Sequence, residues 1–143
     1  MQNIVNKTER EHILVCLSPS PSNERIVRMA GNMAQAFCGS FTALYVQTPG
    51  DTVMNTADMS RLQANMRLAQ QLGAEIVTTH GEDVPTQIAE YARLSDVTKI
   101  VIGRSGIQRR HFWSEPALTE RLITLAPEVD IHIIPDAEVY QSY

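Results

Sequence analysis

Five short apolar runs alternate along the chain with longer stretches in which apolar residues recur every three or four positions. A short continuous apolar run is typical of a buried strand, and the wider spacing is typical of an amphipathic helix. The predicted strands are residues 12–17, 41–46, 75–79, 99–102 and 129–134. The predicted helices have their apolar positions within residues 26–37, 59–69, 84–92 and 118–126, with Phe37, Met59 and Leu125 among the side chains expected to face inward. The pattern therefore predicts the order β-α-β-α-β-α-β-α-β.

Proline, serine and glycine mark the expected ends of these elements. Ser20 is expected to cap the first helix, with Pro21 at its first helical position. Pro49 breaks the second strand, and a polar loop is expected to follow to about Asn55. Ser114 is expected to cap the last helix.

Short apolar strands that alternate with helices favour parallel pairing, with helices on both faces of the sheet. Right-handed crossovers leave few topologies, and the best fit is an α/β doubly wound five-stranded parallel sheet of order 3-2-1-4-5, a three-layer sandwich. In such a sheet the strand order reverses between strands 1 and 4, and ligands bind there, outside the carboxyl ends of the strands. The loops that follow the first and fourth strands are therefore the expected site.

The composition is that of an ordinary globular domain. The 143 residues are 43% hydrophobic and 20% charged, which suits one domain that needs no disulfide or metal. Residues 1–10 are expected to be a flexible segment, 11–136 the domain and 137–143 a tail. Cys16 and Cys38 are expected to be buried thiols in a reducing compartment.

Charge and hydropathy limit the classes of partner that are expected. The net charge of -4 argues against nucleic acid as a partner. The apolar runs are far shorter than the ~20 residues that span a bilayer, so direct membrane insertion is not expected. The chain is expected to be cytoplasmic.

The loop after the fourth predicted strand carries positive charge. Between residues 103 and 114 it has three arginines and no acid, in a chain that is acidic overall. Glycines allow close backbone approach to a ligand, and arginine side chains bind phosphate well. The candidate ligand-binding residues in this loop are Gly103, Arg104, Ser105, Gly106, Arg109 and Arg110. The alternative is that the arginines are only solvated and the glycines only form turns.

The loop after the first predicted strand is the second half of the expected site. Ser18 and Ser20 come just before a helix N-terminus, where hydroxyl and N–H groups can accept an anionic oxygen. Tyr45 ends the neighbouring second strand, and its ring can line a base pocket. The structural alternatives are capping for Ser20 and core packing for Tyr45.

Catalytic signatures are missing. The sequence has no GxxxxGK[ST] phosphate loop, no GxSxG elbow and no paired carboxylates at a strand end. It has no CxxC and no Cys/His cluster with zinc spacing. No cofactor or metal is therefore required, and a binding domain is expected in place of an enzyme.

The order of elements, with Gly-x-x-Gly after the fourth strand, resembles the universal stress protein fold, a fold similar to that of adenine nucleotide alpha hydrolases. Residues 13–18, 41–49, 68–75 and 99–105 resemble more closely the stress-protein-like domain of the KdpD family of potassium- and turgor-sensing histidine kinases. The resemblance covers roughly residues 11–136. It implies a cytoplasmic sensory input domain of a membrane-bound kinase, with the other kinase domains as partners.

Two ligand-binding motifs are known in the family, and this sequence matches the first of them only in part. Many stress proteins bind ATP through Gly-x2-Gly-x9-Gly-Ser/Thr. Here Gly103 and Gly106 match, but Pro116 and Ala117 stand at the last two positions, which argues against ATP. The aspartate that those proteins often carry at the end of the first strand is also replaced, by Leu17-Ser18.

The second ligand-binding motif is matched at every fixed position. Some sensor kinases of this type bind cyclic di-AMP through Ser-x-Ser, twenty residues, then Phe-Thr-Ala-x-Tyr. The matching residues are Ser18, Ser20, Phe41, Thr42, Ala43 and Tyr45. The resemblance thus implies cyclic di-AMP as the favoured ligand and these residues as its site.

Two other functions remain open. One is a protein interaction or homodimer module, motivated by the last strand and by the aromatic pair Phe112 and Trp113, which can stack on a partner or fold back over the last helix. The other is a free-standing universal stress protein that binds and slowly hydrolyses ATP.

Overall fold

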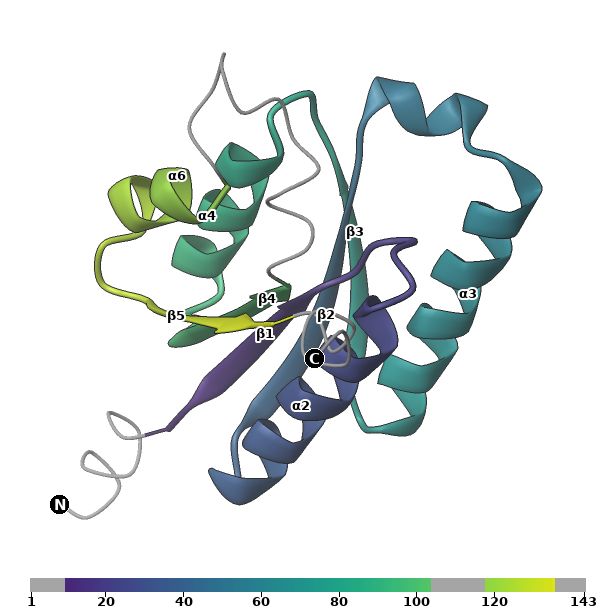
Figure 1. Cartoon of the computed structure of the whole chain (residues 1–143). Coiled ribbons are helices and arrows are strands. Elements are labelled where there is room, and N and C mark those ends of the chain that lie inside the picture. Colours follow the sequence, from purple (N-terminus) through teal and green to yellow (C-terminus); the bar gives the residue numbers. More distant parts are fainter. Residues whose placement is uncertain (1–9, 104–117, 136–143) are drawn as a thin grey trace, which may run out of the picture.

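The computed structural model describes residues 10–103 and 118–135, which form a five-stranded parallel sheet with helices on both faces (Figure 1). The strand order β3-β2-β1-β4-β5 confirms the predicted topology. The strands are β1 (His12–Cys16), β2 (Ser40–Gln47), β3 (Glu75–His80), β4 (Lys99–Gly103) and β5 (Asp130–Ile134). The helices are α2 (Asn23–Ala36), α3 (Thr56–Gln71), α4 (Val84–Leu94), α6 (Leu118–Leu125) and the short 3-10 helix η1 (Pro49–Val53).

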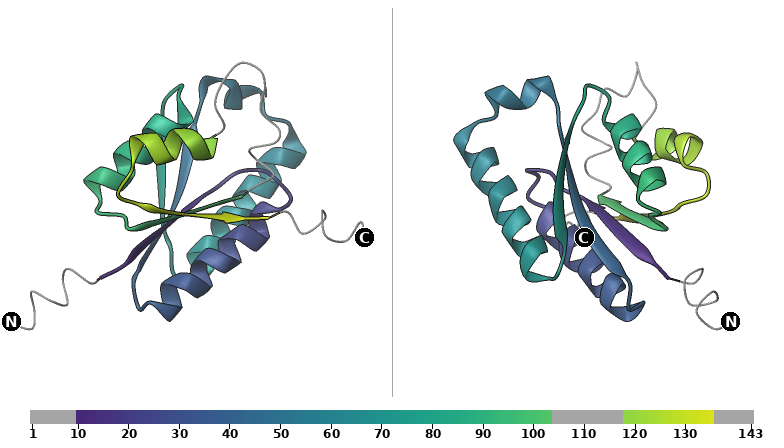
Figure 2. Two further views of the ribbon diagram at one scale, coloured as in Figure 1. Left: turned by 60° about the vertical axis from the view of Figure 1, so that its left-hand side comes forward. Right: turned by 180° about the vertical axis from the view of Figure 1, so that it is seen from behind.

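Each face of the sheet has its own hydrophobic core, because successive residues of a strand point to opposite sides. Ile13 and Val15 of β1 pack with α2 and α3, whereas Leu14 packs with α4 and α6. Figure 2 shows the two helix pairs on opposite sides of the sheet. Because β1 is covered on both faces, its residues from Ile13 to Cys16 form a continuous apolar run, which allowed the strand to be predicted from the sequence.

Strand β1 lies at the centre of the sheet. It pairs with β2 from His12↔Ser40 to Cys16↔Leu44 and with β4 from Ile13↔Lys99 to Val15↔Val101. The chain leaves β1 toward α2 on one face, whereas α6, which precedes β5, lies on the other face. The carboxyl ends of β1 and β4 therefore flank the point where the strand order reverses.

The start of α2 differs from the prediction. Ser20 is not the cap: the helix begins at Asn23, after Ser22. The N–H of Asn23 donates to the carbonyl of Ser20 at 3.0 Å, so residues 20–23 form a turn with Pro21 at its second position, where proline is favoured. The fixed φ of Pro21 suits a turn as well as a first helical residue, and the sequence pattern does not separate the two.

The segment after β2 is also more regular than expected. Residues 49–53 form η1 in place of a polar loop, and Thr48 and Asp51 close it with a capping box. Proline at the first position of this helix costs no hydrogen bond, because the N–H there has no helical partner.

Several side chains predicted to be inward are exposed. Phe37, Met59 and Leu125 lie at helix ends, where neighbouring elements cover less of a side chain. Cys38 is exposed, contrary to the prediction of a buried thiol, because it follows the end of α2 in a left-handed conformation with φ of 53°. The predicted cap Ser114 lies outside the described residues. Within the described part of the chain, no helix is long and apolar enough to cross a membrane.

Candidate functional site

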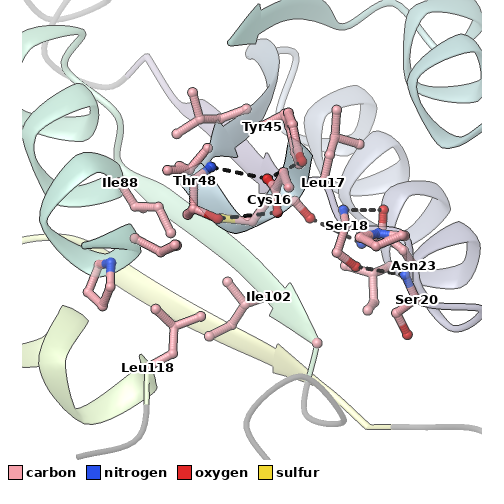
Figure 3. A pocket seen from close by; sticks show the side chains of 18 of the residues that line it. Cys16, Leu17, Ser18, Ser20, Asn23, Tyr45, Thr48, Ile88, Ile102 and Leu118 are labelled. Carbon is pink, nitrogen blue, oxygen red and sulfur yellow. Dashed lines mark hydrogen bonds between the residues drawn. The ribbon is translucent and has the colours of Figure 1, made fainter. Parts of the chain in front are cut away.

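A cavity of about 480 Å³ opens at the carboxyl ends of β1 and β4, where the sequence predicts the site (Figure 3). Its walls combine the loop after β1, the ends of β2 and β4, and the facing residues of α4 and α6. In Figure 3, Ser18, Ser20 and Asn23 lie on one side, and Ile88 and Leu118 on the other. The cavity thus has a polar wall and an apolar wall, the arrangement usual for small-molecule sites.

The polar wall is the loop after β1. Ser18 Oγ accepts a hydrogen bond from the N–H of Ser20 at 3.2 Å, and Ser20 Oγ accepts one from the N–H of Ser22 at 3.3 Å. The hydroxyls of Ser20 and Ser22 are hydrogen-bonded to each other at 2.9 Å, and either one can be the donor. All three serines line the cavity. This wall offers hydroxyl donors and carries no charge of its own.

Two asparagines that the sequence reading did not single out hold this loop. Asn23 is 2% exposed, and its amide donates to the Cys16 carbonyl at 3.1 Å and accepts from the Ser18 N–H at 3.2 Å. Asn65 of α3 is also buried and donates to the Ser18 carbonyl at 3.0 Å. The available signal was an asparagine at a core-facing position of each helix: Asn23 stands three residues before Ile26, and Asn65 takes the place of an apolar residue in the stripe of α3.

Tyr45 is both a core residue and a cavity wall, so the two alternatives drawn from the sequence coexist. Its hydroxyl donates to Asp51 Oδ2, and Asp51 also accepts from the N–H and hydroxyl of Thr48 at 3.1 and 3.2 Å. Burial, and then the hydrogen bond to Asp51, raise the pKa of Tyr45 well above its usual value. The phenol therefore stays neutral, with its ring fixed between β2 and η1.

The other three residues of the predicted motif lie elsewhere. Phe41, Thr42 and Ala43 are buried in the first half of β2 and do not line this cavity. The hydroxyl of Thr42 bonds to Nε2 of His12 at 2.8 Å, at the amino-terminal end of β1. Parallel strands bring only their carboxyl ends to this crevice, so residues early in β2 pack in the core. Ligand contact by these three residues stays a prediction.

Of the loop after β4, Gly103 lies in the described chain, and it lines the cavity together with Ser18 and Ser20. A Cβ at Gly103 would come within 2.2 Å of Ile26 Cδ1, so glycine lets the end of β4 approach α2. The other predicted residues of this loop lie outside the described residues; they are Arg104, Ser105, Gly106, Arg109 and Arg110.

Charged groups line the side of the cavity next to α4. Asp83 precedes α4 and accepts two hydrogen bonds from Arg121 of α6, at 2.5 and 2.9 Å. Bonding to Arg121, and then to Thr86, holds the pKa of Asp83 below its usual value. Glu82 and Asp51 add two further carboxylates to the lining.

The described residues of the lining include no ionised thiol and no cluster of metal ligands. Burial raises the pKa of the Cys16 thiol to about 12, which keeps it protonated. Among the described residues, no group of three or more His, Cys, Asp or Glu side chains is placed to hold a metal ion. The described side chains can bind and orient a ligand through hydroxyls, amides and apolar contact.

The chain belongs to the universal stress protein family, whose sequence profile matches residues 9–127. A universal stress protein solved in complex with cAMP has the same fold, with a TM-score of 0.67 at 18% identity, covering 90% of this chain and 99% of that one. The universal stress protein of Archaeoglobus fulgidus in complex with dAMP gives 0.58 at 21% identity, covering 88% and 98%.

Within this family the sequence is similar to sensor protein KdpD, which confirms the resemblance found in the sequence. KdpD of Clostridium acetobutylicum is 37% identical over 136 residues, which make up 93% of this chain and 15% of that protein. The chain therefore spans a small part of the length of this relative.

Proposed function

We propose that this chain is the nucleotide-binding regulatory domain of a KdpD-type potassium- or turgor-sensing histidine kinase, and that cyclic di-AMP is its ligand. One observation carries the proposal. The cavity where the strand order reverses gathers Ser18, Ser20 and Tyr45, three residues of the motif that matches cyclic di-AMP-binding kinases, with Gly103 at its other edge.

The chemistry of the cavity suits one half of this ligand. The serine hydroxyls can donate to a phosphate, and the partial positive charge at the N-terminus of α2 favours an anion there. The Tyr45 ring and the side chains of Ile88 and Ile102 offer an apolar wall for adenine. The volume of about 480 Å³ is within the usual range for small-molecule sites.

Cyclic di-AMP has two phosphates and two adenines, so we expect its second half to extend beyond this cavity. Arg104, Arg109 and Arg110 stay candidates for the second phosphate, and another domain of the parent protein is a further candidate. The cAMP and dAMP bound by structurally similar stress proteins support an adenine nucleotide. ATP is disfavoured, because Pro116 and Ala117 replace half of the expected phosphate clamp.

Isothermal titration calorimetry with cyclic di-AMP, cyclic di-GMP and ATP tests the proposal. We expect heat and saturation with cyclic di-AMP and much weaker responses to the other two. Ser20→Ala removes a hydroxyl from the polar wall and is expected to weaken cyclic di-AMP binding by about 1 kcal/mol, or about fivefold.

Ser40→Ala is the matched control, since Ser40 is exposed at the opposite end of β2. It is expected to leave the affinity unchanged. No heat with cyclic di-AMP at micromolar protein would refute the ligand, and equal affinities of the two serine variants would refute the role of the polar wall.

In this proposal the domain lies on the cytoplasmic side of the membrane and acts by binding, with the other kinase domains as its partners. A second copy of the chain is an alternative partner, because β5 is an edge strand with Ile133 exposed on it. Sedimentation velocity at micromolar concentration distinguishes the two. A dimer that Ile133→Lys dissociates would favour pairing through β5, and a monomer throughout would refute it.

A further inference from the structure

The ion pair between Arg121 and Asp83, on the α4 side of the cavity, supplies the positive charge of the described lining. Among the described residues that line the cavity, Arg121 is the single lysine or arginine. The same lining includes three carboxylates, those of Asp51, Glu82 and Asp83. In this structure it binds Asp83 through two parallel hydrogen bonds, at 2.5 and 2.9 Å. Two parallel N–H groups are also the geometry with which a guanidinium binds two oxygens of a phosphate.

The ion pair between Arg121 and Asp83 is accessible to water and to an incoming anion. The side chains are 29% exposed for Arg121 and 44% for Asp83, and ion pairs this accessible to water contribute little to stability. Asp83 also keeps other stabilising contacts without Arg121. It accepts from the Thr86 hydroxyl and stands at the N-terminus of α4, where a negative charge is favoured. A phosphate that enters the cavity can therefore take the place of Asp83 at the Arg121 guanidinium at small cost.

We propose that Arg121 is an anion-binding residue of the cavity and that Asp83 competes with the ligand for it. For cyclic di-AMP this inference rests on the proposed function. For a simple phosphate anion it rests on the geometry of the pair alone. Arg121 lies on α6, whose residue Leu118 faces Ser18 and Ser20 across the cavity in Figure 3, so the two walls would bind the ligand from opposite sides.

Competition predicts opposite effects of the two partners on cyclic di-AMP affinity. Asp83→Asn weakens the hold on Arg121 and is expected to tighten binding about fivefold, whereas Arg121→Gln is expected to weaken it about tenfold. In the double variant the gain from Asp83→Asn should disappear, because no guanidinium is left to release. A pair that only ties α4 to α6 would instead give similar affinity losses in both single variants.

Glu82→Gln is the matched control. Glu82 also lines the cavity and its substitution removes the same charge, but the hydrogen bonds that Arg121 donates to a carboxylate of the lining go to Asp83. It is expected to change the affinity by less than about twofold, because an exposed charge is well screened. Urea unfolding of each variant confirms that it is folded at the temperature of the titration.

Inorganic pyrophosphate and adenosine complete the titrations. Pyrophosphate should rank the variants as cyclic di-AMP does, and adenosine, which has no phosphate, should not distinguish them. Equal gains in Asp83→Asn and Glu82→Gln, or a gain that persists without Arg121, would overturn the inference while leaving cyclic di-AMP binding intact. If pyrophosphate follows the predicted ranking and cyclic di-AMP does not bind, the proposed ligand fails and the anion site stands. If neither binds, both are overturned.

Discussion

Asn23→Asp is expected to lower the free energy of unfolding by about 3 kcal/mol or more at neutral pH and to reduce cyclic di-AMP affinity below detection. Asn23 is 2% exposed, and its amide donates to the Cys16 carbonyl. Aspartate would put a charged acceptor against that carbonyl, and a buried charge without a partner is costly. The loop that carries Ser18 and Ser20 would lose the bond that fixes it.

This effect should depend on pH in a defined direction. Burial raises the pKa of the new carboxyl above the unfolded value of about 3.9, so the destabilisation is complete above the raised pKa, shrinks as the pH falls toward the unfolded value and is absent below it. A protonated carboxyl can donate to the Cys16 carbonyl in place of the amide. Urea unfolding at pH 7 and near pH 3.5 measures the difference relative to the natural sequence.

Asn32→Asp is the control for this substitution, because Asn32 lies on the same helix and is exposed. It adds the same charge and is expected to cost less than about 1 kcal/mol. Similar losses for the two variants, or a loss at Asn23 that does not change with pH, would show that the buried amide does not hold the loop.

Leu14→Ala is expected to lower the free energy of unfolding by about 2–5 kcal/mol. Leu14 is at the centre of β1 with 0% exposure and packs between the sheet and helices α4 and α6. Truncation removes buried apolar surface and leaves a cavity that the neighbouring residues fill incompletely. Because Leu14 does not line the cavity at the strand ends, nucleotide affinity should survive well below the unfolding temperature.

Leu94→Ala provides the comparison, since Leu94 is 70% exposed at the end of α4. The same change there is expected to cost less than about 0.5 kcal/mol. Calorimetric unfolding of both variants measures the two effects. A cost at Leu14 no greater than at Leu94 would contradict the assigned packing on that face of the sheet.

The strands and their order were predictable from the sequence because the central strands β1 and β4 are apolar on both faces and turn residues separate the strands from the helices. The rule that ligands bind where strand order reverses then located the cavity, and Ser18, Ser20 and Gly103 do line it together. Phe41, Thr42 and Ala43 were included because they share a motif with Tyr45. They lie in the first half of β2, away from the cavity at its carboxyl end. A sequence motif does not show which of its residues reach the end of the strand.

The residues that hold the site were not predictable in the same way. Asn65 and Arg121 act across distances in sequence of 47 and 38 residues, to Ser18 and Asp83 respectively. From the sequence alone, a polar residue on a helix is expected to face solvent, because its hydrogen-bond partner on another element is unknown. The start of α2 was misplaced because Pro21 is equally suited to a turn and to a first helical residue.

The alternation of strands and helices, the parallel sheet and the end of the sheet at which the cavity opens could all be predicted from the sequence. These follow from local periodicity and from the handedness of crossovers, which every segment expresses independently. Which polar groups contact one another depends on the tertiary structure. The hold of Asn23 on the loop after β1 and the pairing of Asp83 with Arg121 each depend on close contacts between side chains and backbone, which form only when separate elements pack.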